Sequence, residues 1–212
     1  YHGDTMTTTS AALASSNLLN PFKKYKNAHV EAGLRSFNLK EPFPEEISRK
    51  IADKFSNVLF AVSENSVKNL KKYENSKQII NSGNTILDSV DLTLKISKKK
   101  NLKKLSSKKF GLISVHRHEN IKNYERLSKI VKILSALTIP SFFTLHDNTK
   151  NQLIKFKLYE KLKSNKNIKI ISPIDYENFI WQIKNCSLVV CDGGSMQEES
   201  LIFQKPCIIL RK

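Results

Sequence analysis

The stretch Leu188-Val-Val-Cys-Asp-Gly-Gly-Ser-Met-Gln-Glu-Glu-Ser200 decides the fold, because it reads as a strand, a glycine turn and a helix start. The apolar run Leu188–Cys191 is typical of a buried strand. Gly193 and Gly194 are typical of a tight turn. Glu198 and Glu199 place negative charge in the first turn of the following helix, where the helix dipole favours it. A helix N-terminus behind a glycine turn has unpaired N–H groups that can hold an anion. The stretch therefore predicts either a phosphate site or an ordinary strand-to-helix turn.

Strands and helices alternate in both directions from this stretch. We expect strands at residues 28–31, 58–63, 77–82, 110–115, 141–145, 168–171 and 207–210. We expect helices at residues 5–19, 44–55, 64–72, 86–95, 122–136, 150–163, 176–184 and 196–203. This order predicts an α/β fold of doubly wound parallel sheets with helices on both faces. Ligands of such sheets bind at the carboxyl ends of the strands.

Residues 98–109 are rich in lysine and serine and hold few large apolar side chains, which is typical of a connection. We therefore predict domains at 1–95 and 110–212, joined by a linker at 96–109. The chain starts at Tyr1, just before an expected strand end at Asp4, and it stops at an expected strand end. A domain rarely starts on the last residues of a strand. We expect the chain to be an internal fragment of a longer protein.

Composition narrows the class of protein. The net charge of +17 would suit a nucleic-acid-binding protein, but the lysines are spread over many expected helix faces without interleaved aromatic residues. We expect a solvated, lysine-rich surface and no nucleic-acid partner. No apolar run approaches the ~20 residues that a membrane span needs, so membrane insertion is not expected. Cys186, Cys191 and Cys207 lie in or beside expected strands, as buried thiols of a reducing, cytoplasmic compartment do.

Carboxylates follow neighbouring strands in the first half of the chain. Asp4 and Glu31 end consecutive expected strands, and Glu45 opens a helix whose preceding loop returns to the same edge. Clustered carboxylates raise one another's pKa, so that one can act as a base while another is protonated. The alternative is a set of helix caps and surface acids, and we favour that alternative for Glu46.

Basic side chains follow strands in the second half. His116 could donate to a phosphate or carry a proton, and Arg117, like Arg49, could form a forked contact with phosphate. His118 forms a pair with His116, but no third ligand follows at a recognisable spacing, so we expect no metal. His146 follows another strand. His29 lies inside a strand, where a hydrogen-bonded core residue is expected.

Several motifs match those of a known family and occur in the same order along the chain. They are His2-Gly-Asp-Thr, His29-Val-Glu-Ala-Gly-Leu-Arg35, Pro42-Phe-Pro-Glu-Glu46 with Arg49, Gly83-Asn-Thr85, His116-Arg-x-Glu119, Leu145-His146 and Asp192-Gly-Gly-Ser-Met-Gln-Glu-Glu199. With these motifs the chain resembles the bacterial UDP-N-acetylglucosamine 2-epimerases throughout its length. The second and third motifs are highly specific for that family, whereas the Asp-Gly-Gly segment alone is not.

The resemblance implies two Rossmann-like domains that face a cleft, the glycosyltransferase-B architecture, with both domains incomplete here. It implies that UDP-N-acetylglucosamine loses its C2 proton and UDP, giving a 2-acetamidoglucal intermediate. UDP is then added back to give UDP-N-acetylmannosamine for surface polysaccharides. Hydrolysing relatives add water instead and release N-acetylmannosamine and UDP. The resemblance implies no cofactor and no metal, and a homodimer, and we expect this fragment alone to be inactive.

The resemblance also implies roles for single residues. Asp4, Glu31 and Glu45 match the acids around the sugar, as general acid and base candidates at C2 and at the departing diphosphate. His116 matches the histidine that stabilises charge on that diphosphate. His146 matches a position where some members contact a second, activating UDP-N-acetylglucosamine.

The remaining matches concern the nucleotide. Phe179 matches a residue at the uracil pocket, and Glu199 matches the acid that takes the ribose hydroxyls. Gly194 and Ser195 match the turn whose amides hold phosphate. The family turn is usually Asp-Ser-Gly-Gly, so the hydroxyl that is usual at position 193 is absent here, and it is open whether Ser195 replaces it. Two other departures are Ile174, where many members have glutamine near uracil, and Val115, which replaces a frequent glycine.

Two other classes of protein remain open. A glycosyltransferase of the same architecture would share Glu199 and the glycine turn, but transfer to an acceptor does not need the carboxylates Glu31 and Glu45. A basic nucleic-acid-binding protein would show steep salt-dependent retention on DNA or RNA and no response to UDP.

Overall fold

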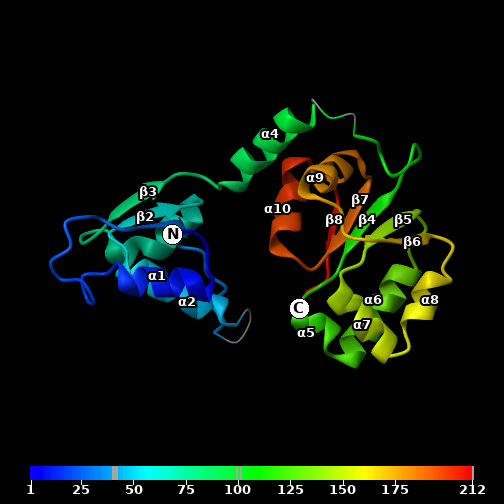
Figure 1. Ribbon diagram of the computed structural model, residues 1–212, viewed down its shortest axis with the longest axis horizontal. Coiled ribbons are helices and arrows are strands. Elements are labelled where there is room, and N and C mark those ends of the chain that lie inside the picture. The colour runs from blue at the N-terminus through cyan, green and yellow to red at the C-terminus, as the bar shows by residue number, and fades with distance from the viewer. Residues whose placement is uncertain (40–42, 99, 101, 212) are drawn as a thin grey trace. The chain divides into compact units, whose positions relative to one another are not determined.

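The computed structural model describes residues 1–39, 43–98, 100 and 102–211 (Figure 1). Pro42 of the third motif and residues 99 and 101 of the predicted linker therefore lie outside the described residues. The chain divides into two compact units, Tyr1–Thr85 (unit 1) and Ile86–Lys212 (unit 2). The division precedes the predicted domain end at residue 95, because helix α4 (Ile86–Ser97) packs through Val90 and Leu94 against Ile180 and Ile183 of unit 2.

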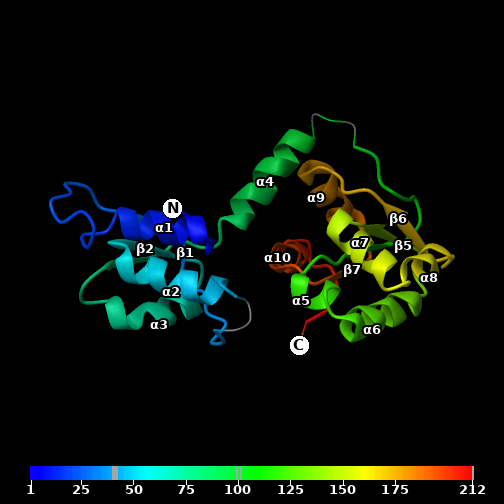
Figure 2. The same cartoon turned by 60° about the horizontal axis from the view of Figure 1, so that its bottom comes forward.

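Unit 1 contains a parallel sheet in the order β1-β2-β3, formed by β1 (Ala28–Ala32), β2 (Val58–Ala61) and β3 (Gln78–Asn81). The first residues extend this sheet beyond β1, since Gly3 N donates to Val30 O at 3.0 Å. The helices are α1 (Met6–Ala14), α2 (Glu45–Phe55) and α3 (Glu64–Leu70), with a 3₁₀ turn at Lys71–Tyr73. Helix α2 packs against α1 (Figure 2). Leu70 of α3 packs onto Leu59 and Ala61 of the sheet.

Unit 2 is built on a five-stranded parallel sheet in the order β6-β5-β4-β7-β8. The strands are β4 (Gly111–Ser114), β5 (Ser141–Thr144), β6 (Ile168–Ile171), β7 (Leu188–Cys191) and β8 (Cys207–Ile209). The helices after α4 are α5 (His118–Ile121), α6 (Tyr124–Ser135), α7 (Asp147–Lys155), α8 (Tyr159–Lys163), α9 (Tyr176–Asn185) and α10 (Gly194–Ile202). Helices α6, α7 and α8 cover one face, and α4, α9 and α10 cover the other (Figure 1). The predicted doubly wound parallel sheet is thus confirmed in unit 2.

Helix starts explain much of the local structure. Thr5, Ser63, Asn123 and Asp175 each accept a hydrogen bond from a backbone N–H in the first turn of the helix that follows. Helix α10 begins differently from these four helices, because Gly193 stands at its N-cap and no side chain caps it. Its first N–H groups are therefore available to another acceptor.

Two predicted helices need correction, and one short helix was not predicted. Helix α1 ends at Ala14 and not at residue 19. Ser15 occupies the C-cap position, and its hydroxyl donates to Ala11 O at 2.7 Å. The helix predicted at 150–163 is two helices, α7 and α8, which are separated at Lys157 by a left-handed backbone with φ of 57°. The one-turn helix α5 was not predicted at all.

In the described parts of the chain, no helix combines the length and apolar character needed to cross a membrane.

Candidate functional site

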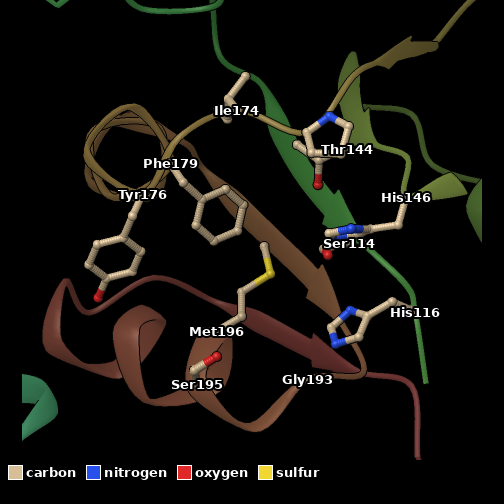
Figure 3. Close-up of a pocket in the computed structure, with 11 residues that line it drawn as sticks. Ser114, His116, Thr144, His146, Ile174, Tyr176, Phe179, Gly193, Ser195 and Met196 are labelled. Carbon is tan, nitrogen blue, oxygen red and sulfur yellow. The ribbon is translucent and has the colours of Figure 1, made fainter.

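A cavity of about 250 Å³ opens at the carboxyl ends of β4, β5 and β7 in unit 2 (Figure 3). One wall is apolar and consists of Ile174, Phe179 and Met196. The opposite side carries the imidazole rings of His116 and His146, whose centroids lie 5.4 Å apart. An apolar slot beside polar donors suits a flat ring that is joined to a charged or polar group.

The glycine turn that precedes α10 borders this cavity. Gly193 and Ser195 line it, and α10 begins at Gly194 without a side-chain cap. A Cβ atom at position 193 would lie only 3.0 Å from Cε1 of His116, which is tighter than ordinary packing allows. Glycine at this position therefore lets the His116 ring lie against the backbone. The arrangement presents helix N–H groups and an imidazole to the same side of the cavity.

The carboxylate of Asp192 comes directly before the glycine turn and holds several backbone groups of this region. It is fully buried and accepts from the N–H groups of His116 and Arg117, at 3.1 and 2.9 Å, and from Nδ2 of Asn120 at 3.0 Å. Its backbone carbonyl accepts from Nε of Arg211 at 2.9 Å. Asp192 thus connects the turn after β4 to the turn after β7. The sequence placed Asp192 at a strand end, but no pattern pointed to this structural role.

His116 is about half exposed, with 48% of its side-chain surface accessible. Partial burial lowers the pKa of its imidazole below the ordinary value, and this effect outweighs the opposing influence of the Asp192 carboxylate, whose Oδ1 lies 3.6 Å from Nδ1. Neighbouring His146 and Arg117 lower the pKa further. The ring is therefore neutral near pH 7 and can act as a hydrogen-bond donor or proton carrier.

A pH titration checks this assignment. We expect the His116 ring, followed by NMR and identified by loss of its signals in His116→Gln, to titrate with a midpoint below the unperturbed value of about 6.5. Because the unfolded chain takes up this proton first, the contribution of His116 to stability falls as the pH drops from about 6.5 towards the folded-state pKa. A midpoint at or above the unperturbed value would contradict the assignment.

Glu199 of α10 and Tyr176 of α9 form a polar pair in which Glu199 is buried and Tyr176 is partly exposed. Glu199 has only 2% of its surface exposed, and burial raises the pKa of its carboxyl. Partial burial raises the pKa of the Tyr176 hydroxyl, and so does the carboxyl of Glu199, to which it is hydrogen-bonded. Tyr176 itself lines the cavity next to Phe179 (Figure 3). Glu199 and Phe179 were predicted from the sequence, whereas Tyr176 was not.

The two arginines chosen from the sequence are both paired with carboxylates. Nη1 of Arg117 donates to Oε1 of Glu119 at 2.8 Å, and Arg117 is not among the described residues that line the cavity. In unit 1, Nε and Nη2 of Arg49 donate to Oδ2 of Asp4 at 2.9 and 2.6 Å. Contact of either guanidinium with phosphate remains a prediction.

Unit 1 brings Asp4 and Glu31 to neighbouring positions at the carboxyl edge of its sheet. A Cβ atom on Gly3, the residue before Asp4, would lie 3.6 Å from Oε2 of Glu31. Glu31 itself has a left-handed backbone with φ of 71°, at an irregularity in the pairing of β1 with β2. A residue other than glycine is strained in this conformation, and such strain is concentrated at functional positions. The bend directs the Glu31 side chain differently from a regular strand.

The acids at the start of α2 differ in their surroundings. Glu46 is fully buried and accepts from the N–H group of Ser36 at 2.8 Å, which agrees with a structural role. Oε2 of Glu45 is buried without a hydrogen-bond partner among the described residues. Glu45 lies one helical turn before Arg49, the partner of Asp4, so Glu45 and Arg49 lie on the same face of α2.

The described ranges contain no group of three or more His, Cys, Asp or Glu side chains that could hold a metal ion. The thiols of Cys186, Cys191 and Cys207 are free, and Sγ of Cys191 lies 3.6 Å from Sγ of Cys207.

Known proteins resemble this chain over its whole length. The family model for UDP-N-acetylglucosamine 2-epimerase matches residues 1–212. The UDP-N-acetylglucosamine 2-epimerase of Methanocaldococcus jannaschii is 40% identical over 220 residues, which is 99% of this chain and 58% of the relative. The UDP-2,3-diacetamido-2,3-dideoxy-D-glucuronate 2-epimerase of Pseudomonas aeruginosa is 34% identical and is matched over 57% of its length. The chain therefore spans less than two thirds of the curated relatives it matches.

Solved structures resemble the chain as well. The crystal structure of Methanocaldococcus jannaschii UDP-GlcNAc 2-epimerase in complex with UDP-GlcNAc and UDP matches with a TM-score of 0.83 and 40% identity, over 100% of this chain and 59% of that one. The structure of the Neisseria meningitidis UDP-GlcNAc 2-epimerase bound to UDP-GlcNAc matches with a TM-score of 0.81 and 31% identity, over 58% of its length.

Proposed function

Because the chain belongs to the UDP-N-acetylglucosamine 2-epimerase family, we propose that the protein interconverts UDP-N-acetylglucosamine and UDP-N-acetylmannosamine. A base takes the proton from C2, and UDP leaves C1 with the bonding electron pair, giving 2-acetamidoglucal. UDP then returns to C1 while C2 receives a proton on its other face. The observation that carries this proposal is the 40% identity with a relative whose crystal structure contains UDP-GlcNAc and UDP.

Unit 2 would bind the UDP part of the substrate. The slot beside Phe179 suits the uracil ring, and the carboxylate of Glu199 suits the ribose hydroxyls. The uncapped start of α10 at Gly193, Gly194 and Ser195 would donate N–H groups to the diphosphate. His116, which lies against Gly193, would stabilise the negative charge that grows on the departing diphosphate.

Unit 1 would supply the carboxylates for proton transfer at C2. Asp4, Glu31 and Glu45 are the candidates, because removal and return of a proton on opposite faces need an acid and a base. Arg49 holds the Asp4 carboxylate at 2.6 Å. Glu31, on its strained backbone, is our preferred base at C2.

Release of free N-acetylmannosamine is the alternative outcome of the same elimination, in which water replaces UDP at C1. We also propose that the protein is a cytoplasmic homodimer without a nucleic-acid partner. Light scattering after size-exclusion chromatography tests the dimer. Retention on immobilised DNA or RNA at increasing salt tests whether a nucleic-acid partner is absent. Steep salt-dependent retention would contradict its absence.

UDP affinity tests the role of Glu199. We expect Glu199→Gln to weaken UDP binding by about tenfold, since a hydrogen bond to a charged acceptor contributes roughly 1.5–3 kcal/mol and glutamine keeps only part of it. Isothermal titration of the full-length protein measures the change. Glu198→Gln, one residue earlier on α10, is the matched control and should keep its affinity within about twofold. Equal loss in both variants would argue against a specific ribose contact.

A further inference from the structure

His29 lies in β1 and is fully buried, so its ring cannot touch a substrate. The ring nevertheless joins three separate segments of unit 1. Nε2 lies 2.9 Å from the carbonyl oxygen of Gly3, and Nδ1 lies 2.7 Å from Oδ1 of Asp53 on α2. Nη2 of Arg35, from the loop after β1, donates to the other oxygen of Asp53 at 2.5 Å. The four residues form a buried chain that runs from Arg35 to the Gly3 carbonyl.

The partners determine the direction of each hydrogen bond. A carbonyl oxygen can only accept, so Nε2 of His29 carries a hydrogen and donates it to Gly3. On the other side of the ring, Nδ1 of His29 is hydrogen-bonded to the carboxyl of Asp53, which is itself held by Arg35. The side chain of Asp53 is fully buried and that of Arg35 is 6% exposed, so water does not compete for these contacts. The imidazole is therefore fixed in orientation on both sides.

The Gly3 peptide connects these hydrogen-bonded residues to the carboxylates of Asp4 and Glu31. Gly3 has a left-handed backbone with φ of 75°, and its N–H donates to Val30 O while its carbonyl accepts from His29. Asp4 is the next residue. Rotation of the Gly3–Asp4 peptide would move the Asp4 carboxylate relative to Glu31, whose Oε2 lies beside Gly3.

We propose that His29 is a positioning residue for the C2 proton transfer. Its hydrogen bond to the Gly3 carbonyl, held in line by Asp53 and Arg35, sets where the Asp4 carboxylate stands relative to Glu31. The inference rests on the proposed function, because it assigns His29 to the reaction that Asp4 and Glu31 serve. Displacement of a reacting group by about 1 Å can slow a reaction about 10²-fold. The effect should appear in kcat, because His29 does not contact the UDP part of the substrate.

A pair of matched variants separates the two hydrogen bonds of His29. Glutamine places its amide N–H near the position of Nε2 and can keep the Gly3 bond, whereas asparagine reaches only the position of Nδ1. We expect His29→Asn to lower kcat for C2 deuterium exchange about 10²-fold in the full-length protein, with KM and UDP affinity within about twofold of wild type. His29→Gln should recover at least about tenfold of that loss.

A control variant separates positioning from simple loss of stability. Asn27 precedes β1 and is buried at the opposite end of the strand, where its Nδ2 donates to Phe55 O at 2.9 Å. Asn27→Ala should lower the melting temperature as His29→Asn does but keep kcat within about threefold. If the His29 variants do not fold, Arg35→Gln provides the test, since it loosens Asp53 and should lower kcat about tenfold at constant KM.

Each outcome decides between the two claims. An inactive, folded wild-type protein would overturn the proposed function and with it the role of His29. An active wild-type protein whose His29→Asn variant keeps its kcat would overturn the role of His29 alone. The role of His29 would also be overturned if Asn27→Ala lost as much kcat as His29→Asn. The same holds if His29→Gln and His29→Asn lost kcat equally. An unchanged kcat in Arg35→Gln would overturn it where the His29 variants do not fold.

Discussion

Glu31→Gln is expected to abolish exchange of the C2 hydrogen of UDP-N-acetylglucosamine with solvent deuterium while leaving UDP binding intact. Glutamine has nearly the same shape as glutamate but cannot accept the proton, and loss of a general base costs about 10²–10⁴-fold in rate. The bend of β1 at Glu31, with φ of 71°, is retained because the backbone contacts of Gly3 and Val30 do not involve the carboxylate. NMR of the full-length protein in deuterated water measures the exchange.

A control in the same unit separates catalysis from general loss of charge. Glu64 follows β2 in the first turn of α3, and its Oε1 accepts from Nδ2 of Asn81 at 2.7 Å. Glu64→Gln should exchange C2 at the wild-type rate. Asp4→Asn should behave as Glu31→Gln does. Wild-type exchange in Glu31→Gln or in Asp4→Asn would remove that residue from the reaction.

Asp192→Ala is expected to destabilise unit 2 by about 3–5 kcal/mol, because removal of a buried charge leaves several donors unpaired at once. The N–H groups of His116 and Arg117 and the amide of Asn120 would all lose their acceptor. A loss of this size lowers the melting temperature by roughly 10–20 °C in a domain of this kind. UDP affinity should fall as well, since the glycine turn follows Asp192 directly.

Thermal melting followed by circular dichroism, with and without UDP, measures both effects. Asp192→Asn is the matched variant, since it keeps the size of the side chain and one acceptor oxygen, and it should lose less than half as much stability. A melting temperature of Asp192→Ala within about 2 °C of wild type would contradict the structural role that we assign to this carboxylate.

The fold was predictable where local patterns decide the structure. The apolar runs at Leu188–Cys191 and Ile168–Ile171 became strands with the predicted bounds. Their alternation with helices was enough to predict parallel sheets. The break between α7 and α8 was not predictable, because it depends on a left-handed backbone at Lys157, a residue type that carries no turn signal.

The candidate site was predictable in part for a similar reason. Polar residues at strand ends, such as Asp4, Glu31 and His116, are visible in the sequence once the strands are assigned. Asp53 and Tyr176 were missed, because each lies on a helix and acts on a residue of another element. Such pairs appear only when the packing of α2 on β1, or of α9 near α10, is known.

The most direct test of the central claim is incubation of the full-length wild-type protein with UDP-N-acetylglucosamine in deuterated water, followed by NMR. We predict that deuterium appears at C2 while UDP-N-acetylmannosamine accumulates. Free N-acetylmannosamine together with UDP would instead assign the hydrolysing reaction to the same carboxylates. A folded protein that binds UDP but leaves the C2 hydrogen unexchanged would contradict the account.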